Sequence, residues 1–435
     1  MSSAEVAAPT DEVSARARRG VERITRRAQE AGKTLATAQR TVKDAALLAI
    51  AEALNSETER IVAANKRDLA AAEESGVDAT MLDRLALDAD RVAAIAGAVR
   101  EIAALPDPVG NVITGSTLAN GIRLRQVRVP MGVIGVIYEA RPNVTVDIAA
   151  LALKSGNAVV LRGGSAAART NAVLSDVLRW AIASVGLPAD LVSSIDEFGR
   201  DGARALMQSR DFVDLLIPRG GAELIATVVQ ESIVPVIETG VGNVHMFIDS
   251  SAELKTTLDL VLNSKTHRPS VCNALETLLV HEKAAKRMMT KIIAALDSAG
   301  VTIHGDVATS EFAPDGVRIR RANRRDWVKE YLGLDIAVAV VSDIEEAIEH
   351  IERYSSGHTD VIVTNDVRSA DRFVAAVDSA AVGVNVSSRF TDGGQFGLGA
   401  EVGISTQKLH ARGPMGLTEL TTSKWIVHGE GQVRE

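Results

Sequence analysis

The chain has 435 residues, of which 46% are hydrophobic and 24% are charged, with 34 glycines, 11 prolines and a formal net charge of −8. These values are typical of a globular protein and exclude a disordered, collagen-like or low-complexity chain. No apolar run approaches the roughly 20 residues that cross a bilayer, and the acidic net charge disfavours nonspecific binding to nucleic acid. We therefore expect neither a membrane nor a nucleic acid as a partner.

The chain starts with a short segment, residues 1–12, that carries acids and no long apolar stretch. This segment is predicted to be a disordered lead rather than a signal peptide, so that a cytoplasmic location is the default expectation. The single cysteine, Cys272, cannot form an intramolecular disulfide and fits a reducing compartment.

Arginines concentrate between residues 16 and 27 and could form a contact surface for nucleic acid. Proteins that bind single strands place aromatic side chains among their positive charges, yet the first aromatic residue of this chain is Tyr138. The favoured interpretation is therefore the solvated face of a helix, formed by Arg16, Arg18, Arg19, Arg23, Arg26 and Arg27.

Residues 13–104 are predicted to be helical throughout. Apolar residues such as Ala45 and Ala49 recur there at helical spacing. Ser56 followed by Glu59 has the pattern of a capping box and predicts the start of a new helix.

Apolar residues alternate with arginines over residues 121–130, which predicts a strand with one solvated face. The C-terminal segment, residues 421–435, offers one more alternating strand, which we expect to pair with the first near residue 125. We expect these strands to form a ribbon, made of residues 121–135 and 418–435, that leaves the body of the protein.

Short apolar runs alternate with helical segments after residue 131. This alternation predicts parallel strands joined by crossover helices, and such a sheet binds ligands beyond the carboxyl ends of its strands. The predicted strands of this first series are residues 132–139, 158–164, 191–196, 213–218 and 234–239.

A second series of the same kind follows, with helices predicted at about residues 282–299, 343–356 and 368–378. Its predicted strands are residues 275–281, 301–306, 335–341, 359–366 and 381–388. The predicted fold class is therefore α/β, with two doubly wound α/β domains. We expect the first domain to comprise residues 1–120 and 136–243, and the second, with Cys272, residues 244–417.

Cys272 is the first candidate for chemistry. Pro269 is expected to end the preceding helix, so that the cysteine falls in a polar loop before a strand. A lone cysteine is often a small buried hydrophobe. Here the charges of Lys265, His267 and Arg268 could favour the thiolate, which indicates a reactive thiol.

An acyl group attacked by a thiolate requires donors for the oxyanion that forms, typically a side-chain amide and a backbone N–H. Asn143 follows a predicted strand, at the edge where a parallel sheet presents its ligands. The alternative is ordinary turn chemistry.

Two glycine pairs with an arginine stand where predicted strands end and helices begin. The sequence contains neither a GxxxxGK loop nor a clean GxGxxG motif after a strand. Glycine allows close approach of the backbone, and a helix N-terminus and an arginine both favour a phosphate, although simple turns share this composition. The two segments are Arg162-Gly163-Gly164-Ser165 and Pro218-Arg219-Gly220-Gly221.

A third glycine cluster, residues 389–401, follows the last predicted strand of the second series. It suggests either a loop that covers a ligand or a long surface connection. The eight histidines show no metal-binding spacing, and no metal site is expected.

Four segments resemble the gamma-glutamyl phosphate reductase (glutamate-5-semialdehyde dehydrogenase) family, a branch of the aldehyde dehydrogenase superfamily. They are KTHRPSVCNALETLLVH around Cys272, VPMGVIGVIYEARPNVTVD at 129–147, LKSGNAVVLRGGS at 153–165 and RFTDGGQFGLGAEVGIST at 389–406. The resemblance runs from about residue 30 to the C-terminus.

The resemblance implies NADPH-dependent reduction of L-glutamyl 5-phosphate to L-glutamate 5-semialdehyde with release of phosphate, the second step of proline biosynthesis from glutamate. Cys272 would attack the acyl phosphate and form a thioester, which hydride from the nicotinamide would reduce. Asn143 and the Cys272 backbone N–H would hold the resulting oxyanion. The substrate is supplied by the resemblance and not by the composition.

The resemblance also implies a cofactor site. Arg162 stands where a lysine that contacts ribose is usual, and the residues after it lack the acid of NAD-preferring relatives, which fits NADP. Glu330 resembles the acid that contacts the nicotinamide ribose. The remaining expected cofactor residues are Gly163, Gly164, Ser165, Arg219, Gly220 and Gly221.

Glu238 corresponds to the superfamily glutamate that activates hydrolytic water, and its role in a reductase stays open. Arg141, Arg268 and Arg389 are candidates for binding the substrate, by charge and motif position. The ribbon implies a homodimer or larger homo-oligomer, and an association with glutamate 5-kinase is also possible.

Two alternatives belong to other functional classes. A hydrolytic semialdehyde dehydrogenase would use Glu238 to activate water, but the segment at 162–165 and the motif around Cys272 argue against it. A non-catalytic oligomeric scaffold of the same fold would not need the motifs that surround the cysteine.

Overall fold

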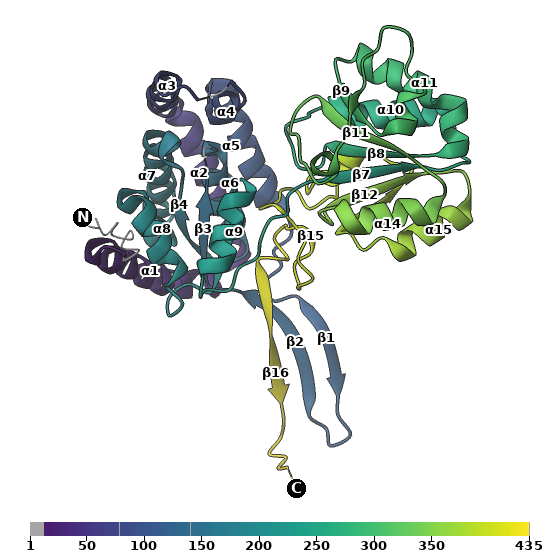
Figure 1. Ribbon diagram of the computed structural model, residues 1–435. Coiled ribbons are helices and arrows are strands. Elements are labelled where there is room, and N and C mark those ends of the chain that lie inside the picture. The colour runs from purple at the N-terminus through teal and green to yellow at the C-terminus, as the bar shows by residue number, and fades with distance from the viewer. Residues whose placement is uncertain (1–12, 78, 140, 435) are drawn as a thin grey trace, which may run out of the picture. The chain divides into compact units, whose positions relative to one another are not determined.

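The computed structural model describes residues 13–77, 79–139 and 141–434, which fold into two compact units (Figure 1). Unit 1 falls within Met1–Val236 and Leu420–Glu435, and unit 2 is Ile237–Glu419. The predicted disordered lead lies outside the described residues. None of the described helices is both long and apolar enough to cross a membrane.

The core of unit 1 is a parallel sheet in the order β5-β4-β3-β6. Its strands are β3 (Val133–Tyr138), β4 (Ala158–Arg162), β5 (Val192–Ser194) and β6 (Leu215–Arg219). The predicted strand at 234–239 is wrong, because only Val236 forms a bridge, to Leu216. Pro235 lacks the N–H that a ladder requires.

Helices cover both faces of this sheet, as the right-handed rule for crossover connections requires. The crossover helices are α6 (Pro142–Lys154), α7 (Ala168–Ser184) and α8 (Gly199–Met207), and α9 (Ala222–Glu231) follows β6. The N-terminal helix α1 (Ala15–Ala36) packs against β4 and α8. A further layer packs on α6 and α7, formed by α2 (Arg40–Ser56), α3 (Thr58–Glu74) and α5 (Ala89–Ala104), with α4 (Ala79–Leu85) beside α3.

The arginines of the N-terminal segment lie on α1 (Ala15–Ala36), and all six are exposed. The predicted capping box is wrong. Helix α2 continues through Ser56, whose hydroxyl donates to the Ala53 carbonyl at 3.0 Å, and Glu57 precedes α3 without a side-chain cap. A serine hydroxyl that bonds back into its own helix is not available to cap the next one.

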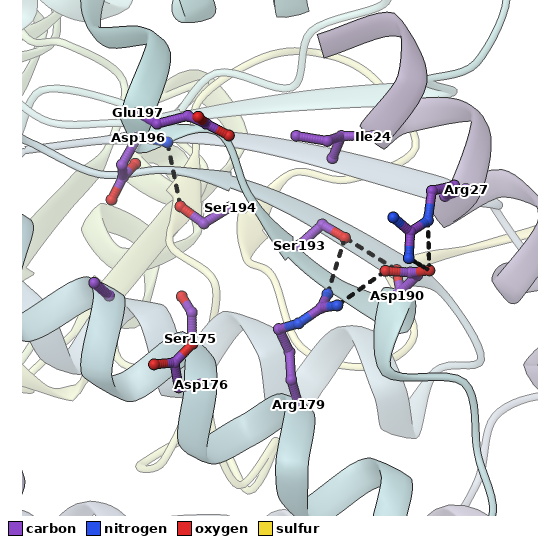
Figure 2. Close-up of a pocket in the computed structure, with 11 residues that line it drawn as sticks. Ile24, Arg27, Ser175, Asp176, Arg179, Asp190, Ser193, Ser194, Asp196 and Glu197 are labelled. Atoms are coloured by element: carbon purple, nitrogen blue, oxygen red, sulfur yellow. Dashed lines mark hydrogen bonds and ion pairs between the residues drawn. The ribbon is translucent and has the colours of Figure 1, made fainter. Parts of the chain in front are cut away.

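A cavity of about 350 Å³ lies at the β5 edge of the unit 1 sheet, between residues of α1 and α7 (Figure 2). Its two arginines, Arg27 and Arg179, both pair with Asp190, at 2.7 and 3.0 Å. Asp190 therefore offsets one of these two positive charges, and the further acids Asp176, Asp196 and Glu197 also line the cavity.

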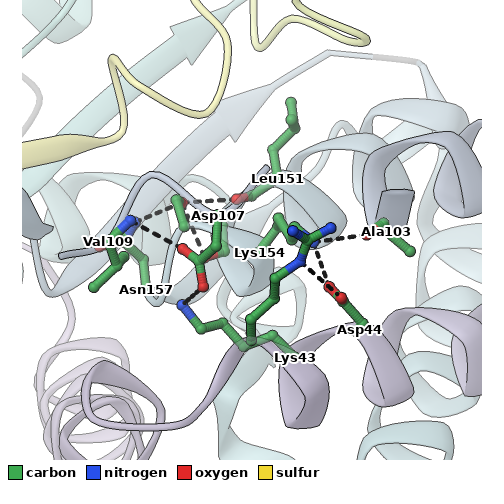
Figure 3. A network of polar contacts seen from close by, with 11 residues as sticks. Lys43, Asp44, Ala103, Asp107, Val109, Leu151, Lys154 and Asn157 are labelled. Atoms are coloured by element: carbon green, nitrogen blue, oxygen red, sulfur yellow. Dashed lines mark hydrogen bonds and ion pairs between the residues drawn. The ribbon is translucent and has the colours of Figure 1, made fainter. Parts of the chain in front are cut away.

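Two lysines attach the outer helices to the sheet unit (Figure 3). Lys43 of α2 is buried and pairs with Asp107 at 2.5 Å. Lys154, at the end of α6, pairs with Asp44 of α2 and donates to the Ala103 carbonyl of α5. Since a buried ammonium requires partners, these contacts fix where α6, and hence its first turn, lies.

Unit 2 is built on a seven-stranded parallel sheet in the order β10-β9-β11-β8-β7-β12-β13. Sequence reasoning missed β7, a short buried run that follows a glycine-rich segment without a helix between. The strands are β7 (Val244–Ile248), β8 (Leu275–His281), β9 (Thr302–Gly305), β10 (Arg320–Arg321), β11 (Asp335–Val341), β12 (Thr359–Val363) and β13 (Ala381–Val384).

Alternate side chains of each strand enter separate cores on the two faces of this sheet. Met246 and Ile248 of β7 pack with α10 and α11, whereas Phe247 packs with α14 and α15. Figure 1 shows these helix pairs on opposite sides of the sheet. The helices are α10 (Leu254–Thr266), α11 (Glu282–Ser298), α12 (Val307–Ser310), α13 (Arg324–Trp327), α14 (Ile344–Tyr354) and α15 (Val367–Ala376), and β14 (Ile404–Ser405) pairs with β15 (Gly413–Pro414).

A separate three-stranded antiparallel sheet belongs to unit 1, in the order β1-β2-β16. Its strands are β1 (Val112–Thr117), β2 (Arg123–Pro130) and β16 (Thr421–His428). The predicted pairing is confirmed, with Ile426 opposite Arg125. Strand β1 was not predicted, because all its residues are exposed and show no alternation. Val133–Gly135, expected in the ribbon, form part of β3 instead.

Candidate active site

Cys272 lies in a turn between α10 and β8, as predicted, and its side chain is half-buried. The next residue holds this turn in place. The Asn273 side chain donates to the Thr391 carbonyl at 2.8 Å, and the Ser388 hydroxyl donates to the Asn273 carbonyl at 2.7 Å. The glycine cluster predicted to cover a ligand therefore begins at the segment that supports the cysteine.

The segment that follows Glu238 passes directly against the cysteine backbone. A Cβ atom added to Gly242 would lie 1.6 Å from the Cys272 carbonyl oxygen, so no side chain fits there. The Glu330 carboxylate accepts the Gly242 N–H at 2.9 Å. Glu330 therefore anchors the backbone segment that lies against Cys272.

Arg389 lies within electrostatic range of the cysteine. Burial lowers the pKa of the Arg389 guanidinium, interactions with the Asp392 carboxylate and the ionisable Cys272 thiol raise it, and the positive charge of Arg268 lowers it. Its Nε donates to Nδ1 of His267 at 3.4 Å. Two of the substrate candidates, Arg389 and Arg268, thus gather on the cysteine's side of unit 2.

Lys265 does not contribute to this positive charge, contrary to the expectation. Its ammonium is buried and pairs with the Glu276 carboxylate at 2.7 Å. Burial raises the pKa of Glu276 to about 7, against the opposing charge of Lys265. The pair joins α10 to β8 beneath the cysteine turn.

A cavity of about 580 Å³ adjoins this cluster within unit 2. Such a volume suits a small molecule. The residues lining it include Asn263, His267, Arg389, Phe390, Asp392 and Gln395.

Glu238 is half-buried, and its backbone N–H donates to the Gln407 side chain at 3.1 Å. Gly240 N–H donates to the Ile404 carbonyl at 2.8 Å. Although the expected domain boundary assigns residues 237–243 to the cofactor domain, the structure places them in unit 2 with Cys272.

In unit 1, Asn143 lies in the first turn of α6. Pro142 begins this helix, where its missing N–H costs nothing. The Asn143 side-chain nitrogen donates to Oδ2 of Asp147, one turn further along, at 3.0 Å. Arg141, the third substrate candidate, is exposed at the residue before the helix.

The first glycine pair follows β4, as predicted, and leads through a short 3-10 helix, Ser165–Ala167, into α7. Gly163 N–H donates to Oδ1 of Asp196 at 2.7 Å, and Nε of Arg162 donates to the Gly199 carbonyl at 3.3 Å. A Cβ on Gly163 would lie 2.0 Å from the Asn171 side chain.

Sequence reasoning missed Asp196. Burial raises the pKa of its carboxyl group, and the Gly163 N–H and the charge of Arg162 lower it. The available signal was its position at the end of a predicted strand, beside the end of the next strand of the sheet.

The second glycine pair lies between β6 and α9, and no side chain caps the start of that helix. Gly221 N–H donates to Oε2 of Glu139 at 3.1 Å, so this amide already binds an anionic oxygen. A Cβ on Gly220 would meet the Glu139 carboxyl carbon at 2.6 Å. The turn has the glycine backbone at a helix start that suits a phosphate group, and a phosphate bound there would replace the Glu139 carboxylate on the Gly221 N–H.

Within the described residues, no group of three or more histidine, cysteine, aspartate or glutamate side chains is arranged to hold a metal ion.

Comparison with known proteins identifies the family. The sequence profile of the aldehyde dehydrogenase family matches residues 4–314. A gamma-glutamyl phosphate reductase from Kineococcus radiotolerans is 60% identical over 412 residues, covering 94% of this chain and 95% of that protein. The protein of that name from Thermobifida fusca is 57% identical over 416 residues, covering 96% of this chain and 99% of that protein.

The crystal structure of the gamma-glutamyl phosphate reductase from Thermotoga maritima is 46% identical, with a TM-score of 0.92, and the match covers 95% of this chain and 100% of that one. The chain belongs to the aldehyde dehydrogenase family and, within it, to the gamma-glutamyl phosphate reductases, which are oxidoreductases of proline biosynthesis. The resemblance and the fold class predicted from the sequence are confirmed.

Proposed function

We propose that the chain catalyses the NADPH-dependent reduction of L-glutamyl 5-phosphate to L-glutamate 5-semialdehyde, with release of phosphate. The observation that carries this proposal is the half-buried Cys272 in a braced turn, with Arg389 within electrostatic range. A nearby guanidinium stabilises a thiolate, which is the nucleophilic form of cysteine.

The first step is attack of the Cys272 thiolate on the acyl carbon. A sulfur–carbon bond forms, and the bond from that carbon to the phosphate oxygen breaks. Phosphate leaves with the electron pair and needs little acid assistance, so the product is a thioester on Cys272. Arg268 and Arg389 supply positive charge for the anionic groups of the substrate in this unit.

The two glycine turns of unit 1 fit a nucleotide with phosphate groups. Gly220 and Gly221 at the start of α9 would bind the pyrophosphate, which would replace the Glu139 carboxylate on the Gly221 N–H. Arg162, Gly163, Gly164 and Ser165 form the ribose side of the site. NADPH supplies the hydride that reduces the thioester. Arg162 favours a 2′-phosphate, and the Asp196 carboxylate is engaged by Gly163 N–H instead of being open to a ribose hydroxyl.

Reduction of the thioester leaves a negative oxygen on the carbon that Cys272 holds. The Asn143 side chain and the Cys272 backbone N–H stabilise this oxyanion. When the oxyanion collapses, the sulfur–carbon bond breaks, the aldehyde leaves and the thiolate is regenerated.

Arg219 and Glu330 complete the cofactor site, and Arg141 is the remaining substrate candidate.

The role of Glu238 stays open, because a glutamate that activated water would hydrolyse the thioester and waste the acyl group. A hydrolytic semialdehyde dehydrogenase remains the alternative that Glu238 permits, and it differs by needing no phosphate in the oxidative direction.

The assembly is proposed to be a homo-oligomer formed through the sheet of β1, β2 and β16. Val112, Ile113, Trp425 and Val427 of this sheet are each about half exposed, and exposed apolar strands favour association. A cytoplasmic location and an association with glutamate 5-kinase stay predictions.

The catalytic assignment is tested by Cys272→Ala. Turnover should be lost, while NADPH binding, followed by its fluorescence, should stay as in the unaltered protein. A variant that still restores growth to a proline auxotroph would overturn the assignment and favour a non-catalytic role for the thiol.

A further inference from the structure

The second turn of α6 contains an acid whose role the reaction has not yet required. Asp147 is half-buried, and its Oδ2 accepts a hydrogen bond from the Asn143 side-chain nitrogen at 3.0 Å. The two residues are one helical turn apart, so their side chains share a face of the helix. Asn143 is the residue proposed above to hold the oxyanion.

We propose that Asp147 is a positioning residue that turns the Asn143 amide so that nitrogen, and not oxygen, faces the reacting carbon. This inference rests on the oxyanion role of Asn143 in the proposed function. It concerns contacts within unit 1 only.

The chemistry of the amide explains why such a residue is needed. A side-chain amide presents two N–H donors on one side and an acceptor oxygen on the other, and the two ends are similar in shape. A carboxylate accepts hydrogen bonds and cannot donate one. Asp147 therefore holds one N–H of Asn143, excludes the flipped amide and leaves the second N–H for an oxyanion.

The surroundings of Asp147 make this orientation depend on its charge. Burial raises the pKa of Asp147 to about 6, while the hydrogen bond from Asn143 and the positive charge of Arg219 lower it. Arg219 stands at the end of β6, and the Glu139 carboxylate faces the turn that follows it. The carboxylate form predominates at neutral pH.

Protonation of Asp147 would remove the constraint. A carboxylic acid can donate its proton to the amide oxygen of Asn143, so the flipped amide becomes acceptable. Turnover that depends on the oriented amide should therefore fall as the pH drops through about 6.

Two variants separate orientation from charge. Asp147→Leu removes the acceptor and should lower kcat by about 10- to 100-fold, with KM for both substrates changed by less than about twofold. Asp147→Asn keeps an acceptor oxygen but adds N–H donors, so like the protonated acid it admits the flipped amide. Its kcat should fall to the low-pH value of the unaltered protein, stay above that of Asp147→Leu and lose the inflection near pH 6. Both are assayed as phosphate-dependent oxidation of L-glutamate 5-semialdehyde with NADP⁺.

A matched control is Asp68→Asn, at another buried acid of unit 1. Its Oδ2 accepts from the Thr170 backbone N–H and hydroxyl at 2.8 and 2.7 Å, at the start of α7. This variant should lower thermal stability and leave the pH profile of kcat unchanged, which is the pattern of a merely structural acid.

A double-mutant cycle decides whether Asp147 acts through Asn143. Asn143→Ala alone should lower kcat by about 100- to 1,000-fold, and adding Asp147→Leu to it should cost less than about twofold more. The inference is overturned if the two losses multiply, if Asp147→Leu raises KM while kcat is kept, or if Asp147→Asn retains the inflection. Full turnover by Asn143→Ala would instead overturn the oxyanion role in the proposed function.

Discussion

Gly242 shows how closely one residue constrains the reacting cysteine. Its α-carbon faces the Cys272 carbonyl so closely that an added Cβ would overlap the carbonyl oxygen, carbon and α-carbon at 1.6, 2.4 and 2.6 Å. The obstacle is backbone rather than the flexible end of a side chain. A methyl group at this position must therefore push the cysteine turn away or displace its own segment.

Gly242→Ala is expected to lower kcat by about 100-fold or more, because a displacement of about 1 Å in a reacting group has that effect. Steady-state kinetics would measure the loss. The control is Gly97→Ala, within α5, where an added Cβ meets nothing within 4 Å. The control should keep full activity and gain about 0.5–1 kcal/mol of stability. Equal kinetics for the two variants would contradict the close approach.

At the scale of elements, the Lys265–Glu276 pair joins α10 to β8 on the two sides of the cysteine turn. Both side chains are fully buried, and the second carboxylate oxygen of Glu276 accepts the Leu332 N–H at 3.2 Å. Burial lowers the pKa of Lys265 while the charge of Glu276 raises it. The attraction between the two charges thus offsets the cost of burying each of them.

Lys265→Met should lower the free energy of unfolding by about 3–5 kcal/mol, since it leaves a buried carboxylate without its cation. Urea unfolding measures this loss. The double variant Lys265→Met/Glu276→Leu should recover most of the stability, because a buried ion pair replaced by apolar groups is often neutral. A double variant that is less stable than the single one would show that the charges themselves hold α10 to β8.

The elements also show what sequence patterns predict well. Buried parallel strands such as β8 and β11 are rich in apolar residues, and they were found with accurate limits. Strand β1 was missed because it is exposed along its whole length, and the run at 234–239 was mistaken for a strand because Pro235 breaks the ladder. The hydrophobic pattern of a sequence indicates which residues are buried. It does not indicate which residues pair in a sheet.

For the site, motifs indicated Cys272 in a polar loop before a strand, and Asn143 and the two glycine turns just after strand ends. The contacts that support them could not be predicted. Asp196 pairs with Gly163 and Glu330 pairs with Gly242, and the members of each pair are far apart in the sequence. The position of Asp196 at a strand end indicated a site residue but did not identify its partner.

For the whole molecule, buried histidines should make stability depend on pH. His358 is fully buried beside β12, and burial lowers its pKa from 6.5 to about 4. The folded chain keeps this imidazole neutral, whereas the unfolded chain binds a proton below pH 6.5. Its contribution to stability is therefore lost as the pH falls from about 6.5 to about 4.

His358→Asn should make the free energy of unfolding less sensitive to pH in this window, by up to about 1.4 kcal/mol per pH unit. Asp360, whose pKa burial raises to about 6, acts in the opposite direction in both proteins, so the difference between them isolates His358. Urea unfolding at several pH values measures it, and parallel curves for the two proteins would contradict the prediction.

In the proposed reaction, an acyl group passes between Cys272 and phosphate. The most direct measurement is the oxidation of L-glutamate 5-semialdehyde with NADP⁺, in the presence and absence of inorganic phosphate. We expect a rate that depends on phosphate and a reaction that yields the acyl phosphate. An undiminished rate without phosphate, yielding glutamate, would contradict this expectation and would assign Glu238 the activation of water.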